Sequence, residues 1–131
     1  MSAVQQMLRA DQSLSLLGIN VVNDESDSGV ATMLVTEEMT NGHQICHGGL
    51  VFSLADTVFA IAANAVNAGT VTSESSISYL APARAGDLLV ADANVTYETD
   101  RRVIVDVTVR TGETTVALYR GFGRTLKPHS A

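Results

Sequence analysis

The most constraining feature of this sequence is an apolar stretch, Gly48 to Ala63, that contains a single ionisable side chain, Asp56. A helix that is apolar on every side is normally buried, so this stretch predicts a helix in the middle of the fold. An unpaired carboxylate is costly to bury. A chain tolerates one most readily at a functional site, which makes Asp56 the leading candidate for a catalytic residue. The structural alternative is a carboxylate that pairs with a distant base or caps nearby backbone.

A polar, glycine-rich segment, residues 41–49, leads into this helix. The first N–H groups of a helix have no acceptor inside it, and the helix dipole adds positive potential there. Gly48 has no Cβ, so a ligand carbonyl could approach its N–H closely. One such donor is typically worth ~3–4 kcal/mol in an acyl-transfer transition state. The alternative is that Gly48 and Gly49 only allow a tight turn or close packing.

Composition narrows the class of protein. A length of 131 residues predicts one domain, 1–131, and no uninterrupted apolar run reaches 18 residues. We therefore expect no membrane association, and the start of the chain does not have the charged-then-apolar pattern of a leader. The single cysteine, Cys46, fits a reducing, cytoplasmic environment. The net charge of −6 argues against general nucleic-acid binding.

The hydrophobic pattern predicts two helices and six strands. A short helix is expected within residues 3–16, and the long helix from about His47 to Asn67, with Gly69 in the position of a C-terminal cap. Antiparallel hairpins dominate the second half, so we expect an α+β fold in which a curved antiparallel β-sheet is wrapped around one long central helix. Apolar residues on the outer sheet face suggest further burial in an oligomer. The predicted strands are Ile19–Asp24, Val30–Val35, Val71–Leu80, 89–97, 103–109 and Thr114–Leu126, and the outer apolar residues are Ile104, Leu118 and Phe122.

The string HGGLVFSLAD, from His47 to Asp56, resembles the hot-dog-fold acyl-CoA thioesterases, specifically their phenylacetic acid degradation branch. The spacing from Asn41 to His47 to Asp56 is similar to that branch, as is the run Ile77–Ala83 followed by Gly86 and Asp87. The resemblance implies the hot-dog fold and hydrolysis of aryl-acyl-CoA, such as phenylacetyl-CoA or its hydroxylated analogues. It also implies no metal, no cofactor, and a homo-oligomer that is a dimer or a dimer of dimers (a homotetramer).

The spacing of two candidate residues bears on assembly. Gly48 and Asp56 are eight residues apart in one predicted helix, which separates them by about 12 Å. Both cannot touch one thioester carbonyl, because each would have to lie within ~3–3.5 Å of it. If both are catalytic, they belong to different subunits, and a two-fold dimer would form two sites at the subunit interface.

Three further residues are candidates for the site by resemblance. Asn41 could position the Asp56 carboxylate or the attacking water from the partner chain, or it could simply stabilise a turn. His47 could contact the thioester or cap the helix start. Thr72 matches the family position where a hydroxyl holds the lytic water, and Ser73 is the fallback if the alignment is shifted by one residue. The structural alternative is that Thr72 is an ordinary strand residue. The residues themselves do not distinguish a nucleophilic from a general-base role for Asp56.

Other readings of the same segment are weaker. Cys46 next to His47 is more typical of a small buried thiol than of a nucleophile, because adjacent side chains usually point in different directions. A metal site is not expected, since glycines interrupt any helical spacing of His43, Cys46 and His47. Phe52 and Phe59 lie at −4 and +3 from Asp56, where they could line an acyl pocket or pack in a dimer interface.

Basic residues are concentrated in the second half of the chain, because no Lys or Arg lies between Arg9 and Arg84. Coenzyme A carries several phosphates, which arginines at strand ends could bind. The candidates for this contact are Arg84, Arg101, Arg102, Arg124 and Lys127. The structural alternative is that each is a solvated strand end.

Three other functions share parts of this pattern. They are a medium-chain fatty acyl-CoA thioesterase, a hot-dog hydratase or dehydratase, and a non-catalytic acyl-CoA binding module. The Asn–His–Asp spacing favours hydrolysis over hydration, and the presence of Asp56 favours catalysis over binding alone.

Overall fold

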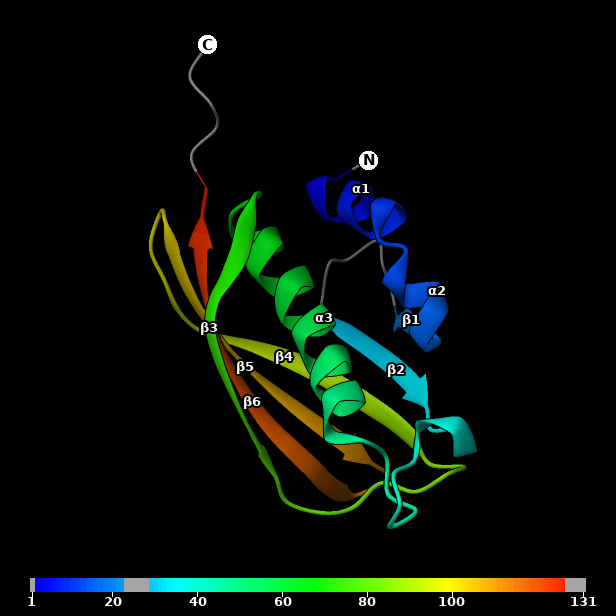
Figure 1. Cartoon of the computed structure of the whole chain (residues 1–131). Coiled ribbons are helices and arrows are strands. Elements are labelled where there is room, and N and C mark those ends of the chain that lie inside the picture. Colours follow the sequence, from blue (N-terminus) through cyan, green and yellow to red (C-terminus); the bar gives the residue numbers. More distant parts are fainter. Residues whose placement is uncertain (1, 23–28, 127–131) are drawn as a thin grey trace.

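The computed structural model describes residues 2–22 and 29–126 of the chain. Six antiparallel strands form one sheet in the order β1-β2-β4-β5-β6-β3. One long helix, α3, lies across this sheet, and the strands curve around it (Figure 1). The elements are α1 (Ala3–Ala10), α2 (Ser13–Leu17), β1 (Ile19–Val22), β2 (Val30–Leu34), the 3-10 turn Glu37–Met39, α3 (Gly48–Val66), β3 (Thr70–Tyr79), β4 (Leu88–Glu98), β5 (Arg102–Thr111) and β6 (Thr114–Thr125).

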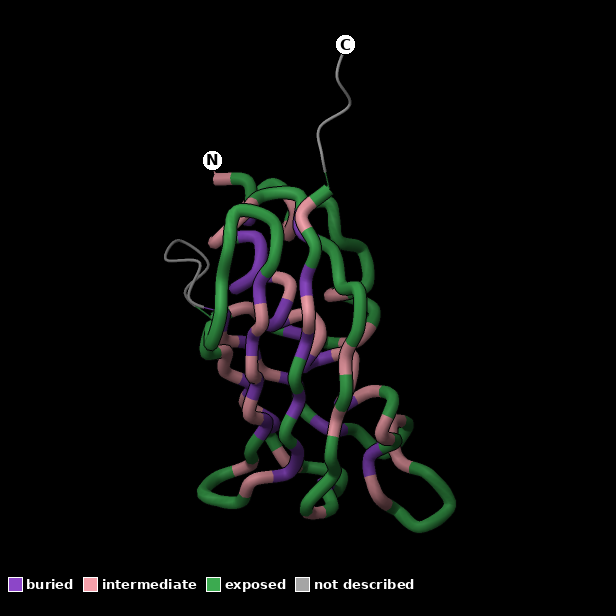
Figure 2. Tube along the Cα trace, turned by 90° about the vertical axis from the view of Figure 1, so that its left-hand side faces the viewer, coloured by how far each residue is buried: buried purple, intermediate pink, exposed green. Residues whose placement is uncertain are grey.

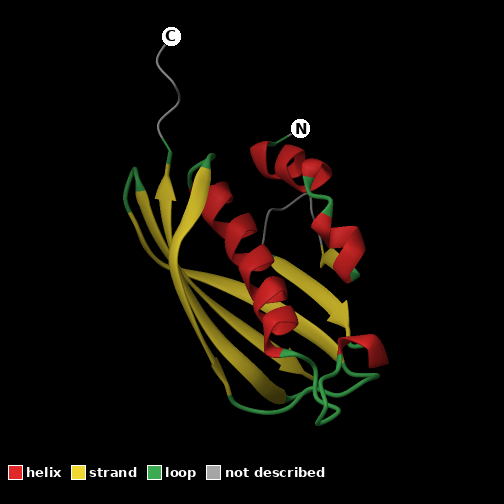
Figure 3. Ribbon diagram, in the orientation of Figure 1, coloured by secondary structure: helices red, strands yellow, loops and turns green. Residues whose placement is uncertain are grey.

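The arrangement confirms the predicted α+β fold with a sheet wrapped around a central helix (Figure 3). Nine of the 19 residues of α3 are buried, as its nearly uniform apolar sequence predicts. By length and composition α3 is apolar enough to cross a membrane, although half of it is buried inside the domain. Its burial against the sheet makes it the core helix of the fold.

Alternation along the strands determines which side chains face α3. Val103, Val105, Val107 and Val109 of β5 are all at most 1% exposed, while the residues between them lie on the outer face. Figure 2 shows buried and exposed positions following one another along the strands. On that outer face, Ile104 pairs with Phe122 and Thr108 with Leu118, so the predicted outer apolar residues are correctly placed.

Two helix predictions need correction. The expected single helix within residues 3–16 is two helices, because the chain leaves helical geometry at Asp11, where an extended backbone ends α1. The long helix ends at Val66 with an extended Asn67, so Gly69 is not its immediate cap. Instead, the buried side chain of Asn64 accepts hydrogen bonds from the N–H groups of Gly69 and Thr70 at 2.9 and 3.1 Å. The turn into β3 is therefore held by a side chain, and Gly69 supplies the positive φ of 83°.

A close approach of backbone to helix fixes α3 on the sheet. A Cβ on Gly121 would lie 2.5 Å from the ring of Phe59, and one on Gly123 would lie 3.1 Å from the same ring. Phe59 is 1% exposed, and burying such a ring contributes about 2–3 kcal/mol. This overturns both expectations for Phe59, because the ring is part of the core and is available neither to an acyl pocket nor to a dimer interface.

Candidate active site

The helix start at Gly48 leaves one backbone donor free. His47 is the N-cap, and its Nδ1 accepts the Gly49 N–H at 3.1 Å. The His47 carbonyl accepts the Leu50 N–H at 2.9 Å. No acceptor for the Gly48 N–H lies among residues 2–22 and 29–126. Of the first three amides of α3, only that of Gly48 is thus available to a ligand.

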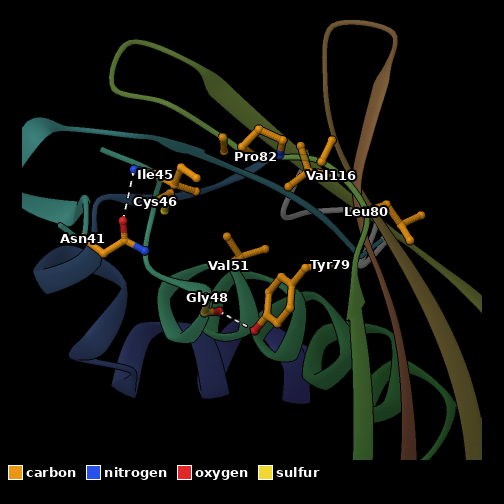
Figure 4. A pocket seen from close by; sticks show the side chains of 11 residues that line it. Asn41, Ile45, Cys46, Gly48, Val51, Tyr79, Leu80, Pro82 and Val116 are labelled. Carbon is orange, nitrogen blue, oxygen red and sulfur yellow. Dashed lines mark hydrogen bonds between the residues drawn. The ribbon is translucent and has the colours of Figure 1, made fainter. Parts of the chain in front are cut away.

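Gly48 also lines a cavity of about 420 Å³. Its lining is mostly apolar and comes from the approach to α3, the end of β3 and the proline loop (Figure 4). The Tyr79 hydroxyl donates to the Gly48 carbonyl at 2.7 Å, so the ring lies over the helix start. The lining residues are Asn41, Ile45, Cys46, Gly48, Val51, Tyr79, Leu80, Ala81, Pro82, Ala83 and Val116.

Asn41 combines a structural role with a free donor. Its Oδ1 accepts the N–H groups of His43 and Ile45 at 2.9 and 3.3 Å, which stabilises the loop before α3. This is the turn role that the sequence left open. The side-chain nitrogen has no acceptor within the described part of the chain, and Figure 4 shows it turned away from Ile45. A ligand or a partner chain can therefore still use the Asn41 amide as a donor.

Asp56 lies in the middle of α3, half-buried, and faces two hydroxyl groups of its own chain. Tyr119 donates to Oδ1 at 2.7 Å, and Thr72 Oγ1 donates to the same atom at 3.2 Å. Ser73, the fallback for Thr72, instead donates to the Phe122 carbonyl at 2.9 Å. The pairing with β6 shifts between Thr72 and Glu74, which makes Ser73 the extra residue of a β-bulge and leaves Thr72 as the one that meets Asp56.

Sequence reasoning missed Tyr119. This residue is 2% exposed, and its position two residues from Ala117 and Gly121 puts it on the helix-facing side of β6. Burial, followed by the hydrogen bond to Asp56, raises the pKa of Tyr119 far above its ordinary value, so its hydroxyl stays protonated and donates. Alternation along the strand could have revealed it, because Leu118 was predicted on the outer face and its neighbour Tyr119 must then lie on the inner face.

One protomer does not bring all the predicted site residues together. Asn41 and Gly48 line the cavity near the start of α3, where His47 is the N-cap, whereas Asp56 does not line it. Asp56 lies eight residues along the helix, about 12 Å away, beside Thr72. The chain thus carries two half-sites, one that offers a backbone donor and one that offers a carboxylate.

Cys46 is the small buried thiol that was predicted. It is 4% exposed, and burial raises the pKa of the Cys46 thiol, which disfavours the reactive thiolate. Across the described ranges, no group of three or more His, Cys, Asp or Glu residues is placed to hold a metal ion.

The structure separates the arginines predicted to bind phosphate. Arg84 lies in the loop before β4, near the start of α3, whereas Arg101 and Arg102 follow the far end of β4, about 34 Å away along the strand. Arg124 is the cross-strand partner of Arg102. The ion pairs of the described residues use other arginines, Arg110 with Asp92 and Arg120 with Asp106. Lys127 lies outside the described residues.

Comparison with known proteins gives a family match, a similar curated protein and a similar solved structure. Residues 43–118 match the thioesterase superfamily. Over 116 residues the chain is 42% identical to the acyl-coenzyme A thioesterase PaaI of Escherichia coli, an alignment that covers 88% of this chain and 83% of that protein. The solved structure of E. coli PaaI superposes with a TM-score of 0.85 and 38% identity, over 95% of this chain and 94% of that one.

A second solved structure is similar and contains a ligand. A Streptococcus mutans protein bound to acetyl CoA has a TM-score of 0.69 and 27% identity, over 77% of this chain and 82% of that one. The family match covers more than half of the chain, and the E. coli relative covers most of it. This chain therefore belongs to the thioesterase superfamily and has its hot-dog fold.

Proposed function

We propose that this protein hydrolyses the thioester bond of aryl-acyl-CoA, with phenylacetyl-CoA or its hydroxylated analogues as substrates. The observation that carries the proposal is the Gly48 N–H, which has no acceptor in the described part of the chain and belongs to a residue that lines an apolar cavity. The choice of acyl group is supported by the E. coli relative, whose structure is described as coming from the phenylacetic acid degradation operon.

The chemistry needs an electrophile, a donor and an attacking oxygen. The thioester carbonyl oxygen accepts the Gly48 N–H, which stabilises the negative charge that develops there. Asp56 either takes a proton from water or attacks the carbonyl carbon itself, in which case water then hydrolyses the acyl-aspartate. In both routes the carbon–sulfur bond breaks, water supplies one oxygen to the acid, and CoA leaves as the thiol.

The cavity beside Gly48 suits an aromatic acyl group. Its volume of about 420 Å³ is within the usual range for small-molecule sites, roughly 300–1,000 Å³. Val51, Leu80, Pro82 and Val116 give it apolar walls, which would bury a phenyl ring and exclude water. The CoA phosphates would then extend toward exposed arginines, and Arg84 lies at the same end of the fold as this cavity.

The active unit that we propose is a homodimer in which each site uses Gly48 from one chain and Asp56 from the other. Two features support a second copy. β3 is an edge strand that pairs only with β6 in the described chain. α3 keeps half-buried apolar residues, among them Phe52, which lies one turn before Asp56. The outer apolar residues Ile104, Leu118 and Phe122 would allow two dimers to form a tetramer. We further propose a cytoplasmic location, since the single cysteine fits a reducing compartment.

The direct test is thiol release from a panel of aryl and medium-chain acyl-CoA esters. We expect the wild type to prefer aryl esters and Asp56→Asn to lower kcat by at least about 100-fold, the scale for loss of a general base or nucleophile. Glu113→Gln, which neutralises an exposed carboxylate in the β5–β6 turn, is the matched control and should retain full activity. Equal rates for wild type and Asp56→Asn would contradict the proposed function.

A further inference from the structure

Tyr119 is a buried polar group whose role the proposed chemistry leaves unassigned. It is 2% exposed, yet its hydroxyl donates to Asp56 Oδ1 at 2.7 Å, a contact between β6 and the middle of α3. Hydrogen bonds to charged groups are stronger than those between neutral groups. The phenol thus makes a strong contact with the one carboxylate of α3.

The ring of Tyr119 is held between two phenylalanines of α3. Its centroid lies 5.5 Å from that of Phe52, at 64°, and 6.0 Å from that of Phe59, at 53°. These are the edge-to-face and tilted geometries that aromatic pairs favour. Gly121 leaves the space for this packing, because a Cβ there would lie 2.5 Å from Phe59 and 2.9 Å from Tyr119. The hydroxyl therefore has one well-defined position.

The two oxygens of Asp56 are not equivalent. Oδ1 accepts both hydroxyls, from Tyr119 and from Thr72, while Oδ2 accepts no hydrogen bond from any described residue. Fixing one oxygen fixes the rotation of the carboxyl group about its own bond. The other oxygen is then presented in one direction, as an attacking group or base requires. Because burial and the Asp56 contact raise the pKa of Tyr119, the hydroxyl remains a donor throughout the physiological range.

We propose that Tyr119 is a positioning residue for thioester hydrolysis, which holds Oδ1 of Asp56 so that Oδ2 does the chemistry. This inference rests on the proposed function, since it assigns a role within the same reaction. Thr72 contributes a second, longer hydrogen bond to the same oxygen, so Tyr119 is the principal anchor.

The test compares Tyr119→Phe with Tyr97→Phe. The first substitution keeps the ring between Phe52 and Phe59 and removes only the hydroxyl, whereas Tyr97 is an exposed residue of β4 and loses the same group elsewhere. We expect Tyr119→Phe to lower kcat by about 10-fold or more, with KM changed by less than about twofold and a melting temperature close to that of wild type. Tyr97→Phe should match the wild type in all three.

A double-mutant cycle separates positioning from packing. If Tyr119 acts through Asp56, Tyr119→Phe should have no further effect on the residual kcat in an Asp56→Asn background. An equal loss of kcat in both backgrounds would overturn the inference, as would an active wild type whose kcat is unchanged by Tyr119→Phe. A wild type that releases no thiol from any ester of the panel would instead overturn the proposed function, and this inference with it.

Discussion

The backbone amide of Gly48 is the smallest unit on which the account depends. Its two neighbours in the first turn, Gly49 and Leu50, find acceptors in the side chain and carbonyl of His47. The cap therefore satisfies the amides after Gly48 and leaves that one open. Capping and the proposed activation of the substrate are compatible because they use different N–H groups.

A pair of substitutions at this position isolates the N–H. Gly48→Ala and Gly48→Pro both add a Cβ, which would lie 2.9 Å from the Tyr79 ring, but only proline lacks the donor. Proline is well tolerated at the first position of a helix, and His47 already has the extended ψ of 132° that a residue before proline favours. We expect kcat for Gly48→Pro to be about 100-fold or more below that of Gly48→Ala, measured by thiol release.

Gly42→Ala serves as the control for adding a methyl group near the site, since a Cβ on Gly42 would have nothing within 4 Å of it. It should retain wild-type activity. Equal kcat values for the alanine and proline variants of Gly48 would show that the amide does not stabilise the transition state.

At the scale of elements, the fold depends on how closely α3 approaches β6. The Phe59 ring occupies the space that a side chain at Gly121 would fill, and the same glycine leaves room for Tyr119. The close approach therefore supports both the core and the position of the carboxylate. Gly121, which has no side chain, therefore helps to determine where Tyr119 and Asp56 meet.

Substituting Gly121 tests this packing. Gly121→Ala would force Phe59 or β6 to shift, and overpacking of this kind costs about 1–3 kcal/mol of the free energy of unfolding. The measurement is denaturant unfolding of Gly121→Ala beside Gly42→Ala, which should unfold like the wild type. Unchanged stability at Gly121 would mean that α3 does not press against β6 there.

The sequence was informative about elements and poorly informative about contacts between them. The uniformly apolar run of α3 and the alternating valines of β5 are local patterns, and each predicts its element without reference to the rest of the chain. The break at Asp11 was missed because the apolar and polar residues on either side continue the same general pattern. The Phe59–Gly121 and Asp56–Tyr119 contacts each join residues more than 60 positions apart, and no local pattern encodes such a pair.

The same distinction applies to the candidate site. Asp56 and Gly48 were found because each is unusual in its local setting, a lone acid in an apolar helix and a glycine at a helix start. Thr72 could be matched only by resemblance, and the bulge at Ser73, the residue that follows it, depends on pairing with β6. Tyr119 looks like any strand residue until the sheet places it against α3.

At the scale of the whole molecule, the proposed mechanism requires a second copy of the chain to join the two half-sites. The donor at Gly48 and the carboxylate of Asp56 lie on one helix about 12 Å apart, so only a neighbouring helix that runs in the opposite direction can bring the two together. Within residues 2–22 and 29–126, β3 has a single neighbouring strand, so its other edge and the half-buried face of α3 are the surfaces that we propose a partner chain covers. Assembly is therefore part of the catalytic mechanism in this account.

Complementation in mixed dimers tests that claim most directly. Equal amounts of Asp56→Asn and Gly48→Pro chains, each nearly inactive alone, are allowed to exchange subunits, and exchange is verified by co-purification through two different tags. A mixed dimer has one site with both defects and one site with neither, so thiol release should recover to about a quarter of the wild-type rate. Verified exchange with no recovery of activity would contradict a site shared between subunits.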